Sequence, residues 1–149
     1  MSLIIFKIVT ACLSTAAFSI VYHLRPQYII YSSLASFVAC TPYLLLSLCD
    51  IGIFMPIFIS TVLMVIFVEI VSRVKKIPSS IIQIPGILPL IPGRILYYTM
   101  SYILKEDYAN AFIYAAELVK TSLAIAIGIT VTSVCFRWMA AVLHKQTDN

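Results

Sequence analysis

The sequence predicts an all-α integral membrane protein with about five transmembrane helices, the fourth of which is broken by proline and glycine. Two observations predict this class: 62% of the 149 residues are hydrophobic, and only 11% are charged. Soluble domains carry about 25% charged residues, because polar side chains must cover their surface. This composition excludes a soluble globular domain and a disordered tail. It also excludes a nucleic-acid module, because the net charge of +4 is not arranged as a Lys/Arg stripe.

Four apolar runs match the roughly 20 residues that a transmembrane helix needs. They are residues 3–22, 28–48, 51–71 and 111–136. The first run contains Lys7 near its start, where the long aliphatic stem can reach the interface. The third contains Glu69 near its end, and the last contains Glu117 and Lys120. The connections are short, so the whole chain, 1–149, is interpreted as a single membrane domain.

Residues 77–104 lie between the third and the last of these runs and are apolar but rich in proline. A straight helix of about 28 residues would be about 42 Å long, which exceeds the roughly 30 Å hydrocarbon core. We therefore interpret residues 80–104 as a further span that is broken or kinked. A re-entrant loop is the alternative, and it would leave four spans with both termini on one side of the membrane.

The basic residues alternate between the two sides of the predicted spans. The side that follows the first, third and last spans receives six of the ten Lys and Arg residues, and the other side receives two, Lys7 and Lys105. The six are Arg25, Arg73, Lys75, Lys76, Arg137 and Lys145. Because cytoplasmic loops carry an excess of Lys and Arg, the N-terminus is predicted outside and the C-terminus inside a multi-pass protein of the cell membrane. A cleaved signal peptide in the first run is the alternative interpretation of the N-terminus.

The tripeptide Ile-Pro-Gly occurs twice, seven residues apart, in the proline-rich segment. Each proline removes a backbone donor and clashes with the carbonyl four residues earlier. Irregular backbone at membrane depth persists only against protein or a water-filled cavity, and transporters use such broken helices to bind substrates and ions. The segment thus predicts a substrate-binding or translocation site, although a kinked helix that only packs against its neighbours is the alternative. The candidate residues are Pro85, Gly86, Pro89, Pro92, Gly93, Arg94, Thr99 and Glu117.

Charged side chains at membrane depth are costly and are therefore candidates for function. The Arg94 guanidinium can hold a carboxylate with two parallel hydrogen bonds, or it can reach the interface or pair with Glu117. Glu117 is a candidate partner for a proton or a substrate amine, or it neutralises Lys120 three residues later. Glu69 precedes Arg73 by four residues, which predicts an interfacial ion pair on one helix face.

The sequence predicts neither an enzyme nor a cofactor. The four cysteines are scattered through apolar runs without a CxxC pair, and the two histidines lie far apart, so no metal site is expected. No Ser or Cys has a His within helical reach, and paired catalytic carboxylates are absent. No Walker motif is present, so transport would draw on an ion gradient, most simply of protons.

Residues 84–100, IPGILPLIPGRILYYTM, together with the preceding residues 69–76, resemble the threonine/serine exporter family, specifically its short C-terminal-type half. The likeness continues through Asp107-Tyr108 into residues 116–128 and covers roughly residues 51–134. The resemblance implies export of threonine and serine, or transport of a small dicarboxylate such as succinate.

The resemblance also implies that the complete transporter joins two membrane halves, so this chain would need a larger partner half. The expected partners are therefore that half, a small amino-acid or dicarboxylate substrate, a coupling proton or ion, and the lipid bilayer, with no nucleic acid. A non-transporting accessory or scaffold subunit is the alternative function.

Overall fold

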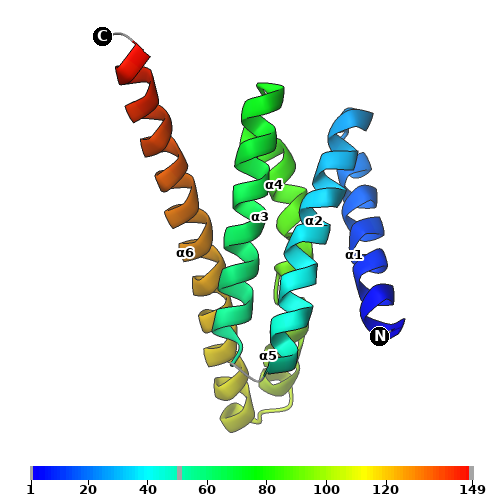
Figure 1. Cartoon of the computed structure of the whole chain (residues 1–149). Coiled ribbons are helices and arrows are strands. Elements are labelled where there is room, and N and C mark those ends of the chain that lie inside the picture. Colours follow the sequence, from blue (N-terminus) through cyan, green and yellow to red (C-terminus); the bar gives the residue numbers. More distant parts are fainter. Residues whose placement is uncertain (1, 50–51, 148–149) are drawn as a thin grey trace.

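A computed structural model describes residues 2–49 and 52–147, with side chains for residues 4–49 and 52–139. The side chain of Lys145, one of the six cations predicted on the cytoplasmic side, lies outside the described residues. The described chain is entirely helical, without a strand (Figure 1). Its elements are α1 (Ser2–Val21), α2 (Pro26–Leu46), η1 (Ser47–Cys49), α3 (Phe54–Lys75), α4 (Ser79–Ile87), η2 (Leu88–Leu90), α5 (Gly93–Leu104) and α6 (Tyr108–Thr147).

Four of these helices are long and apolar enough to cross a membrane, namely α1, α2, α3 and α6. The pair formed by Ser79–Leu90 and Gly93–Leu104 passes the same test together and is bent by 55°. The prediction of an all-α membrane protein with a broken helix fourth in chain order is thus confirmed. The last helix extends beyond the predicted residues 111–136 at both ends, and Asp107 caps its start.

The helices α1 to α4 lie alongside one another, and α6 packs against α3 (Figure 1). The turns α1–α2 and α3–α4 lie at the same end as the C-terminus, here called the C-terminal end. The connections α2–α3 and α5–α6 lie with the N-terminus at the opposite, N-terminal end. Because α4 starts at one end and α5 lies at the other, the bent segment passes through the bundle. By length and composition, this bent pair is either one broken span or a re-entrant loop.

The core lies where α2, α3 and α4 meet, and small residues let these helices approach closely. Its buried members are Ala35, Ala39, Met64, Val65, Val68, Ile82 and Leu90. Gly86 of α4 lies so close to α2 that an added Cβ would be 2.9 Å from the Cβ of Ala35. A 2.8 Å hydrogen bond between the hydroxyls of Ser19 and Ser32 joins α1 to α2. Small residues and hydroxyl pairs are what helices need to associate in lipid, where no hydrophobic effect drives them together.

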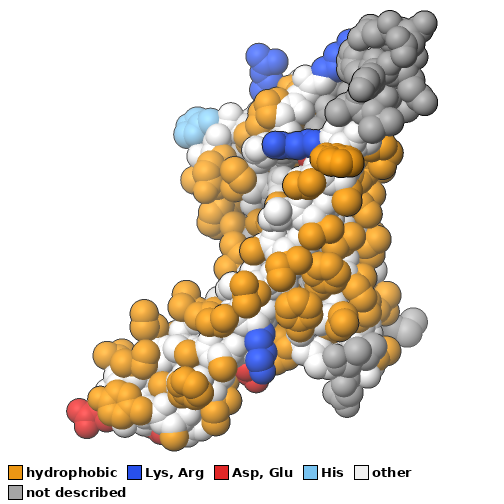
Figure 2. All heavy atoms as spheres, turned by 90° about the vertical axis from the view of Figure 1, so that its left-hand side faces the viewer, with side chains coloured by type: hydrophobic (Ala, Val, Ile, Leu, Met, Phe, Trp, Pro, Cys, Tyr) orange, Lys and Arg blue, Asp and Glu red, His pale blue; other side chains and the backbone are white. Residues whose placement is uncertain are grey.

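The outer surface is apolar along the middle of the bundle, where the hydrocarbon core of a membrane would surround the helices (Figure 2). Figure 2 shows a face whose middle is covered by hydrophobic and uncharged side chains, with acidic and basic side chains above and below it. The lower part, where α5 and the start of α6 lie, projects sideways from the bundle. The large apolar side chains exposed on α6 include Ile127, Val131 and Val134. Lipid, which is itself apolar, is the solvent that suits such a surface.

Candidate functional site

The helix break falls at the second half of the proline-rich segment. α4 continues through Pro85 and Gly86, both of which are buried, and ends only at Ile87. The 3₁₀ turn η2 then contains Pro89, whose ring would clash with the carbonyl four residues earlier if the α-helix continued. Pro92 has a non-helical backbone and precedes the first residue of α5. Only one of the two Pro-Gly pairs therefore stands at the break.

A cavity of about 620 Å³ lies beside this break, and we call it the Arg94 cavity. Tyr43 lies close to the end of α2, and Ile53 directly precedes α3, so the cavity lies toward the N-terminal end of the bundle. Its lining residues are Tyr43, Ile53, Ile57, Pro89, Leu90, Ile91, Pro92, Gly93, Arg94, Ile95, Tyr98, Tyr102, Tyr114 and Glu117. The fold therefore brings five of the eight predicted site residues to one cavity, from the break, α5 and α6.

A column of tyrosines forms one wall of the Arg94 cavity. The guanidinium carbon of Arg94 lies 5.5 Å from the centroid of the Tyr98 ring, within reach of a cation–π interaction. The Tyr98 and Tyr114 centroids are 5.5 Å apart, and the Tyr102 and Tyr114 rings stack at 5.3 Å with an interplanar angle of 12°. The spacing of four residues puts Tyr98 and Tyr102 on one face of α5. α6 contributes the ring that packs between them.

Arg94 and Glu117 line the same cavity without pairing. Among the residues with described side chains, the one ion pair joins Arg73 to Glu69. Among these side chains, no ion pair joins Glu117 to Arg94 or to Lys120. Arg94 is exposed and Glu117 is half-buried. The cavity thus presents a cation, a carboxylate and aromatic rings.

The other three predicted site residues lie outside the cavity lining. Pro85 and Gly86 pack α4 into the core, as described above. Thr99 is buried, and its hydroxyl donates a 2.9 Å hydrogen bond to the carbonyl of Ile95. These residues support the helices on either side of the break.

The predicted pair of Glu69 and Arg73 is confirmed, with 3.9 Å between Nε and a carboxylate oxygen. Arg73 also reaches α6, where it donates a 2.7 Å hydrogen bond to the carbonyl of Phe136 and lies 5.4 Å from the centroid of that ring. Arg73 therefore links α3 to α6 at the C-terminal end, away from the Arg94 cavity.

Sequence reasoning missed Tyr43, Tyr102 and Tyr114 as parts of the site. Tyrosines near span ends are commonly interface anchors, which hides a tyrosine with another role. The spacing of Tyr98 and Tyr102 was the available signal, but nothing in the sequence pairs them with Tyr114. In the described residues, no cluster of His, Cys, Asp and Glu could hold a metal ion.

Comparison with known proteins identifies the family. Residues 7–135 match the family described as "Threonine/Serine exporter, ThrE". This match covers most of the chain, including all lining residues of the Arg94 cavity. The comparisons with curated proteins and with solved structures find no match. The chain, with its broken membrane helix and mixed-charge cavity, belongs to the threonine/serine exporter family, a family of transporters and not of enzymes.

Proposed function

We propose that this chain is the membrane subunit of a two-component secondary transporter that exports small amino acids such as threonine and serine, or related small carboxylates. The Arg94 cavity is the proposed substrate site. The observation that carries the proposal is the presence of Arg94 and Glu117, unpaired with each other, in one cavity at a helix break. Broken helices at such sites are typical of secondary transporters.

The chemistry of the cavity fits a zwitterion. The Arg94 guanidinium would hold the α-carboxylate with two parallel hydrogen bonds. The Glu117 carboxylate and the faces of the tyrosine rings would hold the ammonium group. A dicarboxylate has no ammonium, so an ionised Glu117 would repel it. The mixed charge therefore favours an amino acid over a dicarboxylate.

The larger partner half remains part of the proposal. In the described residues, α6 packs against α3 and α5 and leaves the rest of its surface free. The Arg94 cavity is bordered by this helix, so a second half placed against α6 would close the site. Transporter sites commonly form where two halves meet.

A transport experiment tests the proposal. Export of labelled threonine, serine and succinate would be measured for this chain alone, for a candidate larger half alone, and for both together. We expect export of threonine and serine only with both chains, and dissipation of the proton gradient should abolish it. Transport by the purified chain alone in liposomes would refute the two-component proposal. Succinate transport without threonine transport would refute the substrate assignment.

Glu117 is the proposed binding partner of the substrate amine or of a coupling proton, and Glu117→Gln separates the two. The glutamine keeps the shape but cannot bind a proton. If Glu117 carries the coupling proton, the variant should exchange substrate across the membrane but should not accumulate it against a gradient. Equal accumulation by the variant and the original chain would contradict the coupling role.

The orientation of the termini is also proposed. The excess of Lys and Arg at the C-terminal end supports a cytoplasmic location for that end. Single cysteines at Lys76 and Glu106 in a cysteine-free background would test it with an impermeant thiol reagent. We expect labelling at position 106 from outside and at position 76 only after the membrane is opened. Labelling of position 106 only from the cytoplasm would reverse the orientation.

A further inference from the structure

A second cavity, of about 400 Å³, adjoins the same break, and we call it the Lys7 groove. It is formed by α1, α2 and η2, whereas most of the lining of the Arg94 cavity comes from the break, α3, α5 and α6. Tyr43 and Pro89 line both cavities. The two residues therefore separate one cavity from the other.

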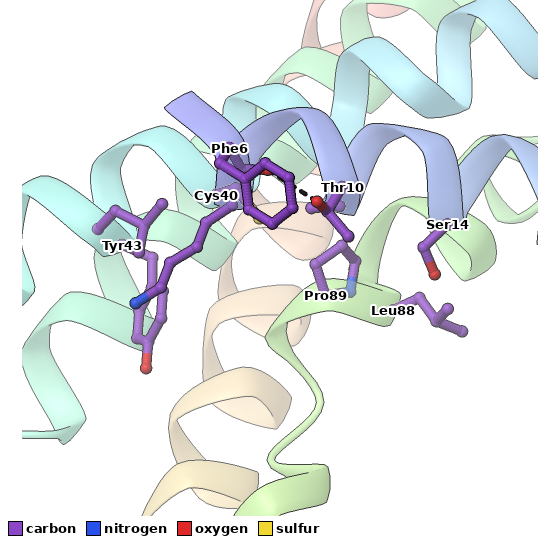
Figure 3. Close-up of a pocket in the computed structure, with 10 residues that line it drawn as sticks. Phe6, Thr10, Ser14, Cys40, Tyr43, Leu88 and Pro89 are labelled. Atoms are coloured by element: carbon purple, nitrogen blue, oxygen red, sulfur yellow. Dashed lines mark hydrogen bonds between the residues drawn. The ribbon is translucent and has the colours of Figure 1, made fainter. Parts of the chain in front are cut away.

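One face of α1 forms the long side of the Lys7 groove. Five residues of this helix line it, and their spacing of three, four and seven residues places them on one side over two turns, about 12 Å. They are Phe6, Lys7, Thr10, Ala11 and Ser14. Figure 3 shows Phe6, Thr10 and Ser14 extending from α1 over Leu88 and Pro89 of the break, with Tyr43 at the end opposite Ser14. The groove thus runs along α1 from near its first turns toward the middle of the bundle.

The lining of the groove is mostly apolar, and its polar side chains are Lys7, Thr10, Ser14 and Tyr43. The hydroxyl of Thr10 donates a 2.8 Å hydrogen bond to the carbonyl of Phe6, so it is already satisfied (Figure 3). Lys7 is exposed, and within the described part of the chain it has no acidic partner within ion-pair distance. Lys7 lies near the start of the first span, where lipid headgroups would lie. Ala11 and Leu88 lie deeper.

We propose that the Lys7 groove binds one phospholipid with an anionic headgroup. Its phosphate would pair with the Lys7 ammonium, and one acyl chain would lie along Ala11, Leu88 and Pro89. Charge complementarity selects an anionic lipid, because the one charged group in the groove is a cation. The apolar floor selects an acyl chain over a soluble phosphate. The lipid would then support Pro89 and Tyr43, the wall shared with the Arg94 cavity.

The experiment measures lipid retained by the purified full chain. The protein is extracted from vesicles of phosphatidylcholine with a minor share of phosphatidylglycerol, and bound lipids are counted by native mass spectrometry. We expect one phosphatidylglycerol on the original chain. Lys7→Gln should lower the retention of phosphatidylglycerol about fivefold, because one lysine contributes roughly that factor to the affinity for an anionic lipid. Lys7→Arg should retain it.

Two further variants separate a built groove from lipid that merely surrounds the protein. Ala11→Phe fills the groove but keeps Lys7, so it should also lose the phosphatidylglycerol. Lys120→Gln removes an exposed lysine of α6 outside the groove and should leave retention unchanged. Equal losses in Lys7→Gln and Lys120→Gln, or full retention in Ala11→Phe, would overturn the proposal. This readout does not depend on transport, the partner half or the orientation of the chain.

Discussion

The two Ile-Pro-Gly tripeptides have the same sequence and opposite roles. In the first, Gly86 packs against α2 inside a continuous helix, where an added Cβ would meet Ala35 at 2.9 Å. In the second, Gly93 opens α5 after the break, and an added Cβ would meet nothing within 4 Å. The first glycine serves close helix packing, and the second stands at the wall of a cavity. Proline and glycine alone therefore do not determine where a membrane helix breaks.

The neighbouring prolines explain the difference. Pro85 has no second proline within the turn before it, so α4 tolerates the single missing donor. Pro89 and Pro92 lie three residues apart, within one turn, and together remove two backbone donors. The chain then changes direction by 55°, and this change creates the wall along which Arg94 and the tyrosines gather.

The largest expected effect comes from restoring the second break to a helix. Pro89→Ala combined with Pro92→Ala returns two donors, and each proline is about 3 kcal/mol less favourable than alanine inside a helix. α4 and α5 should join into a straighter helix, and export of threonine should be lost with the partner half present. Membrane abundance should persist, because apolarity is unchanged.

Spin labels at Ser80 and Leu104 would report the straightening as a longer distance between them. Pro85→Ala is the matched control, since its site is already helical, and it should keep both the distance and export. Full export by the double alanine variant would mean that the break is structural only.

Arg94→Lys is expected to have the next largest effect. Lysine keeps the charge but loses the planar fork that binds a carboxylate with two hydrogen bonds. Losing a hydrogen bond to a charged group costs about 1.5–3 kcal/mol, which is roughly ten- to a hundredfold in affinity. The apparent affinity for threonine measures it. Lys120→Arg, outside the cavity, is the control and should change little. Unchanged affinity in Arg94→Lys would exclude Arg94 as the carboxylate ligand.

A smaller effect, on stability, should distinguish the two glycines directly. Gly86→Ala forces a contact with Ala35 and should lower the free energy of unfolding by about 1–3 kcal/mol, less the roughly 1 kcal/mol gained in helix propensity. Gly93→Ala should be neutral or slightly stabilising. Thermal unfolding in detergent measures both. Ala35→Gly should rescue Gly86→Ala by removing the clashing methyl group. Equal behaviour of the two glycine variants would contradict the packing role of Gly86.

The smallest expected effect concerns Asp107, which caps α6 after α5. Hydrogen bonds from the side chain and backbone of Asn110 lower the pKa of Asp107. A lowered folded-state pKa stabilises the fold above the ordinary aspartate pKa, and this contribution is lost as the pH falls through the folded value. The melting temperature of the original chain should therefore fall slightly in acid, whereas the melting temperature of Asp107→Ala should lack this acid-dependent fall.

Glu106→Gln is the matched control for Asp107. The Glu106 carboxylate makes no hydrogen bond or ion pair in the described part of the chain. The Glu106→Gln variant should therefore keep the small drop in melting temperature in acid. If Asp107→Ala keeps the same acid dependence as the original chain, the cap at Asp107 is not its source.

One ion pair outside the site and one residue of the site followed from local sequence. The spacing of Glu69 and Arg73 predicted their ion pair, because residues four apart on a helix are neighbours. Arg94 was expected at the break because it directly follows the second Pro-Gly pair. The cavity partners Tyr43 and Tyr114 could not be predicted, since they come from helices far away in the sequence.

The sequence by itself determined the class of protein, the four long apolar helices and the break within residues 79–104. These features depend on hydrophobicity, length and the missing proline donors, all of which are local properties. Tertiary structure decided the environments of the two glycines, because Gly86 packs against α2 whereas an added Cβ at Gly93 would meet nothing within 4 Å. It also decided that α2, α5 and α6 meet beside the break. Side chains from separate helices share a cavity only once the helices have packed, and no local pattern records that packing.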